Sequence, residues 1–182
     1  MAAGLGARVT ILEVDLARMR FLDSLQLQGV RTLYSNGQNL RSLLAETDLL
    51  IGAVLLPGAR APKLLLRENL KSMQPGSVLV DIAIDQGGCA ETSHPTTHDA
   101  PVFVEEGVLH YCVANMPGAY ARTATQALTH ATLPYVRKIA DLGGEGALRR
   151  IPELRAGLNV WQGHLTCRAV AETGHGGFAR TA

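Results

Sequence analysis

The sequence predicts an α/β fold in which helices pack on both faces of a doubly wound parallel sheet. Short apolar runs that favour strands alternate with segments of helical period, which is the order that βαβ units produce. The runs at 49–56 and 78–84 are almost continuously apolar, as is typical of strands buried on both faces of a parallel sheet. Because crossovers between parallel strands are right-handed, the predicted architecture is Rossmann-like.

The individual elements follow from this alternation in chain order. Strands are expected at 8–14, 30–34, 49–55, 77–83 and 109–114, and helices near 15–27, 39–47 and 64–73. After Gly118 the character changes, and residues 121–141 predict a helix that Pro134 kinks or restarts. A glycine-rich turn is expected at 143–146, followed by short helices at 146–156 and 166–173. The end of the chain, 174–182, is expected to be frayed.

Composition and charge argue against several classes of protein. The chain has 182 residues, of which 47% are hydrophobic and 18% charged, unlike a disordered or fibrous protein. A net charge of +1 without a basic run argues against a nucleic-acid partner, and no stretch approaches the roughly 18 apolar residues that predict a membrane span. Three widely spaced cysteines fit neither a disulfide framework nor a metal-binding pair, so we expect a cytoplasmic protein.

Glu13 lies where a dinucleotide-binding sheet places an acidic residue, at the end of its second strand. Such a carboxylate binds both hydroxyls of an adenosine ribose and repels a 2′-phosphate, which favours NAD over NADP; an ordinary solvated carboxylate is the alternative. The glycine-rich turn belongs about 20 residues earlier, and Gly4-Leu-Gly6 does not replace it because Val9 occupies the third glycine position. We therefore expect the C-terminal part of a longer protein, without the first strand and glycine-rich turn of the sheet.

The stretch 80–89 is the most informative motif. Asp85 follows the carboxyl end of a predicted strand and precedes a Gly-Gly turn, where an acid projects into the ligand crevice of an α/β sheet. There it can orient a reacting carbonyl or imine or hold a water molecule, with a turn-capping role as the alternative. For Asp81, within the apolar strand, a structural role as a buried, hydrogen-bonded carboxylate stands beside a functional one.

Three further segments border the same predicted crevice. Arg60 and Lys63 follow the third strand and could meet anionic groups, or be exposed cations of an ordinary loop. Asn115 and Met116 end the last strand, where the amide can bond a carboxamide or carboxylate and the thioether can pack on a flat ring; a strand-ending turn is the alternative. The polar loop 94–99 lies nearby, and the spacing of its histidines argues against a metal site.

Four motifs, at 51–63, 80–89, 94–99 and 113–119, include the stretch Val-Asp-Ile-Ala-Ile-Asp-Gln-Gly-Gly-Cys. Together they strongly resemble alanine dehydrogenase, over nearly the whole chain. The resemblance implies reversible oxidative deamination of L-alanine to pyruvate and ammonium with NAD, usually by a homohexamer. It implies one catalytic residue in this chain, Asp85, because the family's catalytic His and substrate-binding Lys belong to the amino-terminal domain. The implied cofactor-binding residues are Glu13, Arg18, Ser35, Val54, Leu55, Ile82, Asp85, Asn115 and Met116.

The resemblance also divides the chain into two parts. Residues 1–119 would form the NAD-binding domain without its amino-terminal strand, and residues 120–182 a helical linker and a returning segment of the substrate domain. The implied partners are the small-molecule substrates and further copies of the protein, with no metal, nucleic acid or membrane. The isolated chain of 182 residues is expected to be inactive.

Two alternatives stay open. The NAD-binding subunit of proton-translocating transhydrogenase shares the fold, but it carries an amide-rich Gln-Asn-Gly-Gly-Asn-Cys type of sequence where this chain has Asp85-Gln-Gly-Gly-Cys89. The other alternative is a non-catalytic remnant of a dinucleotide-binding fold. Such a remnant keeps the rear wall of the crevice but lacks the helix N-terminus that binds pyrophosphate.

Overall fold

The computed structural model describes residues 1–172, and strands alternate with helices through its first half. The order is β1 (Val9–Glu13), α1 (Leu16–Ser24), β2 (Val30–Tyr34), α2 (Gly37–Leu44), β3 (Leu49–Gly52), α3 (Arg67–Leu70), β4 (Val78–Asp81), β5 (Val102–Glu105) and β6 (Val108–Tyr111). The predicted α/β alternation is therefore confirmed.

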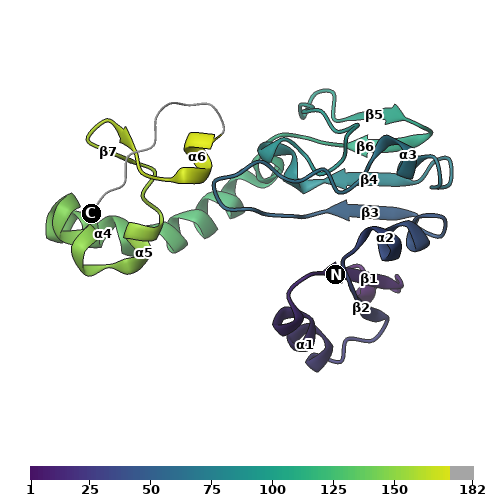
Figure 1. Cartoon of the computed structure of the whole chain (residues 1–182), viewed down its shortest axis with the longest axis horizontal. Coiled ribbons are helices and arrows are strands. Elements are labelled where there is room, and N and C mark those ends of the chain that lie inside the picture. The colour runs from purple at the N-terminus through teal and green to yellow at the C-terminus, as the bar shows by residue number, and fades with distance from the viewer. Residues whose placement is uncertain (173–182) are drawn as a thin grey trace.

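The six strands β1 to β6 form two separate sheets (Figure 1). β1 and β2 are parallel, in register from Val9 opposite Val30 to Glu13 opposite Tyr34. The second sheet has the order β3-β4-β6-β5, in which β5 is antiparallel to β6 and the other pairs are parallel. Within the described residues, no strand pairs with the second edge of β1 or of β3. In a doubly wound sheet whose strands have the spatial order 3-2-1-4, the first strand lies between the second and the fourth, which corresponds to the place between β1 and β3 here.

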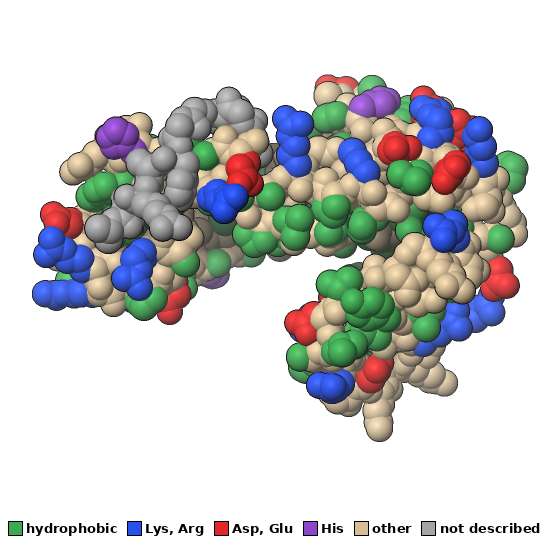
Figure 2. All heavy atoms as spheres, viewed as in Figure 1, with side chains coloured by type: hydrophobic (Ala, Val, Ile, Leu, Met, Phe, Trp, Pro, Cys, Tyr) green, Lys and Arg blue, Asp and Glu red, His purple; other side chains and the backbone are tan. Residues whose placement is uncertain are grey.

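An open hollow lies between the part formed by β1, β2 and α1 and the rest of the chain (Figure 2). Hydrophobic side chains gather on both of its sides, and β3 borders it (Figures 1 and 2). Leu49 and Ile51 of β3 are 50% and 52% exposed. The expectation that this apolar strand is buried on both faces is therefore wrong for the described residues, because no strand or helix among them covers that side.

The main core lies between the four-stranded sheet and the helices α2 and α3. Leu79 of β4 and Val108 of β6 are fully buried against Leu44 and Leu70 from the two helices. Burial of one such side chain contributes about 1.5–3 kcal/mol, so this cluster holds β4 and β6 side by side. The carboxyl ends of these two strands carry four of the nine predicted site residues, Ile82, Asp85, Asn115 and Met116.

Side-chain caps make the chain turn directly after β1 and β2. Asp15 precedes α1, and its Oδ1 accepts hydrogen bonds from the backbone amides of Ala17 and Arg18 at 2.8 and 3.3 Å. Asn36 precedes α2 and accepts a bond from the Asn39 amide at 2.8 Å. These caps satisfy amides that the first helical turn leaves without partners, and each contributes about 1 kcal/mol.

Two predicted elements are shorter in the structure because their residues bond elsewhere. The strand expected to reach residue 83 ends at Asp81, where a 3-10 helix, Ile82–Gln86, begins. The helix expected at 64–73 is reduced to α3, because the amides of Leu64 and Leu65 donate to the Cys89 carbonyl in an extended conformation. This contact ties the loop after β3 to the turn after β4.

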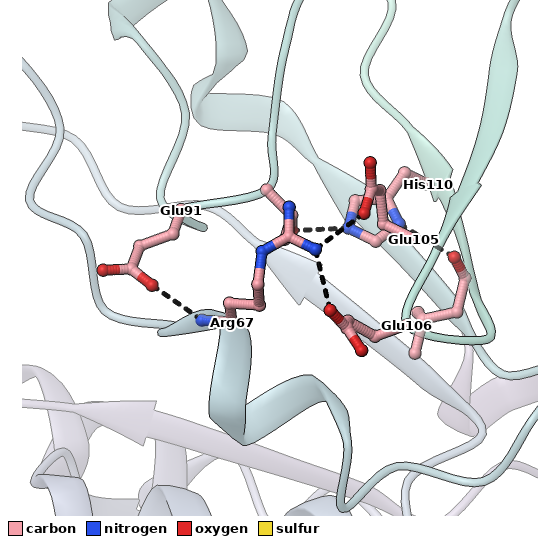
Figure 3. A network of polar contacts seen from close by, with 7 residues as sticks. Arg67, Glu91, Glu105, Glu106 and His110 are labelled. Atoms are coloured by element: carbon pink, nitrogen blue, oxygen red, sulfur yellow. Dashed lines mark hydrogen bonds and ion pairs between the residues drawn. The ribbon is translucent and has the colours of Figure 1, made fainter.

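The β5–β6 hairpin adds an edge strand that the sequence analysis did not predict. Arg67 of α3 holds it: its Nη1 donates to Glu105 Oε2 at 2.8 Å and to Glu106 Oε1 at 2.7 Å, and its backbone amide donates to Glu91 Oε2 at 2.7 Å (Figure 3). The bond from Arg67 lowers the pKa of Glu106 below its usual value. Behind these groups lies the ring of His110, fully buried in β6.

The second part of the chain begins with α4 (Ala121–Arg150), which leads away from the four-stranded sheet (Figure 1). Pro134 lies inside α4, so a restart there is wrong; the residue with non-helical dihedral angles is Gly143, at φ 67° and ψ 162°. The helix is exposed around Pro134, so water can satisfy the carbonyl that lacks its helical donor. The order ends with α5 (Pro152–Ala156), β7 (Val160–Trp161), β8 (His164–Leu165) and α6 (Arg168–Glu172).

The fraying predicted for 174–182 lies outside the described residues. Among residues 1–172, no helix combines the length and the apolar character that crossing a bilayer requires.

Candidate functional site

The candidate site lies at the carboxyl ends of the parallel strands. In open α/β sheets ligands bind outside these ends, because the loops that leave them splay apart. The residues predicted from the sequence follow β1, β2, β3, β4 and β6, and they fall into a group on the two-stranded sheet and a group on the four-stranded sheet. No hydrogen bond joins the two groups within the described part of the chain.

Asp85 and Asn115 meet at the end of the four-stranded sheet. Asp85 lies in the 3-10 helix after β4, and its Oδ1 accepts a hydrogen bond from the backbone amide of Asn115 at 3.3 Å. Asn115 is in the left-handed conformation, at φ 53° and ψ 52°, and precedes the 3-10 helix Met116–Tyr120. A left-handed backbone is costly for most side chains but tolerated by Asn, so this residue type suits the turn. Both side chains are exposed to solvent.

The polar loop 94–99 lies beside this pair. The backbone of Thr96 pairs with the end of β6: its amide donates to the Cys112 carbonyl at 2.9 Å, and its carbonyl accepts from Ala114 at 3.1 Å. Nε2 of His98 lies 3.3 Å from the carbonyl oxygen of Asn115. The loop therefore lies next to the residues that end the last parallel strand.

Glu13 and Ser35 form the second group, at the ends of β1 and β2. Oε1 of Glu13 accepts hydrogen bonds from the amides of Val14 and Asp15 at 2.7 and 3.0 Å, and its carbonyl accepts from Ser35 at 2.9 Å. These bonds fix the carboxylate at the strand end and leave Oε2 without a partner among the described residues. Arg18, further along in α1, stacks its guanidinium over the ring of Phe21 at 5.0 Å.

Four predicted cofactor-binding residues are apolar: Leu55 and Ile82 are exposed, and Val54 and Met116 are half-buried. Leu55 and Ile82 are 69% and 52% exposed, after β3 and β4. Val54 is half-buried and packs on the small cluster of Ala61, Ala83 and Cys89. Val54 is thus held by the scaffold, while Leu55 and Ile82 present apolar surface to solvent.

Lys63 has a different environment from the one predicted. Its ammonium donates to the carbonyl oxygens of Gly87, Gly88 and Ala90 at 2.7, 2.9 and 2.9 Å, so it does not face an open anion site. This contact cannot be predicted from the sequence, because nothing in a linear sequence shows which carbonyls face a lysine twenty-four residues earlier. Arg60 is exposed.

Asp81 is fully buried at the end of β4, which confirms the structural alternative for this residue. Its Oδ2 accepts hydrogen bonds from Ser93 Oγ at 2.6 Å and from the Cys89 amide at 2.8 Å. Burial, and secondarily the Asp81 charge, raises the pKa of the Cys89 thiol to about 12. Cys89 is therefore a protonated thiol at neutral pH and not a nucleophile.

Metal ligands do not gather in the described part of the chain: among residues 1–172, no three His, Cys, Asp or Glu side chains form a group that could hold an ion. Cys89, Cys112 and Cys167 are free thiols.

Comparison with known proteins adds independent information. Residues 1–168 match the family described as "Alanine dehydrogenase/PNT, C-terminal domain". The alanine dehydrogenase of Halomonas elongata is 58% identical over 172 residues, and that of Bacillus subtilis is 54% identical over 172 residues. Each alignment covers 94% of this chain and 46% of the relative, so the chain spans about half the length of the curated relatives it matches.

Solved structures agree with the sequence relatives. An L-alanine dehydrogenase structure superposes with a TM-score of 0.80 at 49% identity, covering 94% of this chain and 47% of that one. A transhydrogenase from Sinorhizobium meliloti superposes with a TM-score of 0.60 at 33% identity, covering 69% of this chain and 35% of that one. The fold, the family match and the identities agree: the chain belongs to the family of alanine dehydrogenase and PNT C-terminal domains.

Proposed function

We propose that this chain is the NAD-binding part of an alanine dehydrogenase. The observation that carries the proposal is the contact of Asp85 with Asn115 at the carboxyl edge of the four-stranded sheet. The relatives of the chain that share this region are named alanine dehydrogenase. An acid and an amide at that edge can bind the polar groups of a small amino acid or keto acid beside a flat cofactor ring.

The donors and acceptors of the site fit NAD. Glu13 offers a carboxylate whose Oε1 is fixed by backbone amides and whose Oε2 can accept bonds from ribose hydroxyls. A negative charge there repels a 2′-phosphate, which favours NAD over NADP. Ser35 and Arg18 would line the adenosine half, Val54, Leu55 and Ile82 would offer apolar contacts, and Asn115 and Met116 would lie at the nicotinamide end.

The overall reaction converts L-alanine, NAD⁺ and water to pyruvate, ammonium, NADH and a proton. Bound NAD⁺ supplies the acceptor for the hydride that leaves the alanine Cα. The role of Asp85 is to accept a hydrogen bond from the water that attacks the resulting imine carbon, and to take up its proton. The exposed side-chain amide of Asn115 holds a carboxamide or carboxylate group of the bound molecules in place.

The remaining parts of the proposal concern the whole protein. Residues 1–119 form the NAD-binding domain, and residues 120–182 form the linker and a segment that returns to the substrate domain. The protein assembles as a homohexamer and works in the cytoplasm, where its free cysteines stay reduced.

A hybrid enzyme tests the proposed function. In this hybrid the chain replaces the matching segment of the Halomonas elongata alanine dehydrogenase, which supplies the other half. We expect L-alanine-dependent formation of NADH, at a rate within about tenfold of the parent enzyme, since 58% of the aligned residues are identical. A correctly folded hybrid that binds NADH but does not oxidise L-alanine would contradict the assignment.

A transhydrogenase-type subunit is the second candidate, favoured by the similarity to the Sinorhizobium meliloti structure. The acid at position 85 argues against it, because that family has an amide-rich turn there. The two candidates differ in what they do with L-alanine: only the dehydrogenase forms NADH from it. A non-catalytic remnant would leave the hybrid without any turnover.

A further inference from the structure

The turn that follows Asp85 is held at its carbonyl side by Lys63. Gly87 and Gly88 both have positive φ, 92° and 75°, which glycine adopts without strain. The carbonyls of Gly87, Gly88 and Ala90 converge on the Lys63 ammonium at 2.7, 2.9 and 2.9 Å. An ammonium has three N–H donors, so every donor of Lys63 is used by this turn.

The amide side of the same turn is held by Asp81. Oδ2 of Asp81 accepts from the amides of Cys89 and Ala90 at 2.8 and 3.4 Å, and the carboxylate is fully buried. A Cβ on Gly88 would lie 2.9 Å from this oxygen, so the turn packs directly on the carboxylate. Oδ2 also accepts a bond from Ser93 Oγ at 2.6 Å, which fixes the orientation of the carboxylate.

Lys63 and Asp81 therefore bind complementary groups of one short segment. A cation that binds carbonyls and an anion that binds amides both form charge-assisted hydrogen bonds, which are about twice as strong as neutral ones. The 3-10 helix that carries Asp85 connects Asp81 directly to this turn, and the Gly87 and Gly88 amides bond back to its carbonyls at Ile84 and Ala83. The position of Asp85 is thus set from both of its ends.

We propose that Lys63 is a positioning residue, which with Asp81 fixes the turn 87–90 and so holds the Asp85 carboxylate against Asn115. Lys63 acts through the backbone: its hydrogen bonds go to the carbonyls of Gly87, Gly88 and Ala90 and not to Asp85 or Asn115. The consequence for turnover rests on the proposed function of Asp85, whereas the effect on the turn does not. Water can solvate the three carbonyls when Lys63 is removed, because its side chain is exposed, so the fold survives the substitution.

The test compares Lys63→Met with Lys71→Met, which removes an exposed lysine of the neighbouring helix end. In the chain of 182 residues, we expect Lys63→Met to speed hydrogen exchange at the Cys89 and Ala90 amides about tenfold or more. Hydrogen exchange of the β4 and β6 amides should stay unchanged in Lys63→Met. Lys71→Met should change exchange neither in the turn nor in these strands. Equal hydrogen-exchange rates of the Cys89 and Ala90 amides in Lys63→Met and in the unsubstituted chain would overturn the proposal.

The hybrid enzyme then tests the link to turnover. Lys63→Met should lower kcat about tenfold while the KM for NAD⁺ changes by less than about twofold, because Glu13, Arg18 and Ser35, which would hold the adenosine half of the cofactor, lie far from the turn 87–90 in the chain and keep their places. A faster-exchanging turn with unchanged kcat would overturn the positioning role. If the unsubstituted hybrid has no L-alanine activity, the proposed function fails, and the exchange experiment on the chain still decides whether Lys63 holds the turn.

Discussion

The carboxylate of Asp85 and the backbone amide of Asn115 meet at 3.3 Å although 30 residues separate them in the chain. The reason is the register of the sheet: Asp85 follows β4, Asn115 follows β6, and these strands are parallel neighbours with Val80 opposite Tyr111. A molecule bound at this edge would meet an acid and an amide at once.

Replacing Asp85 by Asn tests the acid directly. The substitution keeps the size of the side chain and an acceptor oxygen but removes the negative charge, so a water molecule can no longer transfer its proton to this group. In the hybrid enzyme we expect kcat to fall about 100-fold or more, with the KM for NAD⁺ within about twofold of the unsubstituted hybrid.

The matched control is Asp141→Asn, which removes an exposed acid of α4. It should leave both constants unchanged. Steady-state measurement of NADH formation gives both values, and unchanged turnover in Asp85→Asn would rule out the proposed role of this acid.

Glu13 is expected to select NADH over NADPH. Replacing it by Ser removes the acceptor for ribose hydroxyls and the charge that repels a 2′-phosphate. NADH affinity of the hybrid should fall about tenfold while NADPH affinity rises, with Glu46→Ser, at an exposed position after α2, as the control. Fluorescence titration with each nucleotide measures both changes. Equal preference for NADH in Glu13→Ser and in the parent hybrid would show that Glu13 does not contact the ribose.

Gly52 is expected to tolerate no side chain. It ends β3, and a Cβ there would clash with Cys89 Sγ and lie 3.4 Å from Asp81 Oδ1. Gly52→Ala should therefore lower the free energy of unfolding by about 1–3 kcal/mol, because a packed interior has to shift. Gly4→Ala is the control, since nothing lies within 4 Å of its added Cβ. Urea denaturation of the chain measures both, and equal midpoints would refute the close packing at Gly52.

The Cys89 thiol is expected to make stability depend on pH in the alkaline range. Its pKa rises from 9.0 to about 12 because of burial, so the folded chain keeps a proton that the unfolded chain releases between these values. The free energy of unfolding should therefore fall as the pH rises from 9.0 towards about 12, by at most about 1.4 kcal/mol per pH unit from this group. The difference in this slope between the chain and Cys89→Ala isolates the thiol, and identical slopes would contradict its burial as a neutral group.

Much of the fold can be predicted from the sequence, because the main signals are local. The strands expected at 8–14 and 30–34 contain β1 and β2, and the alternation of apolar runs predicts the parallel pairs. β5 was not predicted, because it is held by contacts distant in sequence, from Arg67 to Glu105 and Glu106. The restart expected at Pro134 does not occur, whereas the glycine-rich turn expected at 143–146 contains Gly143, where the backbone of α4 has a positive φ.

The candidate site is predictable only in part. The residues Glu13, Asp85 and Asn115 can be selected from the sequence, because acids and amides after strand ends are local signals. The structural role of Lys63 cannot be selected in this way, since it depends on three carbonyls that the folded turn brings to one point. The sequence also leaves two roles open for Asp81, and only its complete burial decides between them.

The most direct test of the proposed function follows one deuterium atom. The hybrid enzyme is incubated with NAD⁺ and L-alanine that carries deuterium at Cα, and the NADH formed is analysed by mass spectrometry. If the chain binds NAD⁺ beside the substrate, the deuterium is recovered on the nicotinamide ring, and Asp85→Asn lowers the rate at which deuterated NADH accumulates without redirecting the deuterium. Loss of the deuterium to water, or no NADH from a folded hybrid, would contradict the assignment of this chain to L-alanine oxidation.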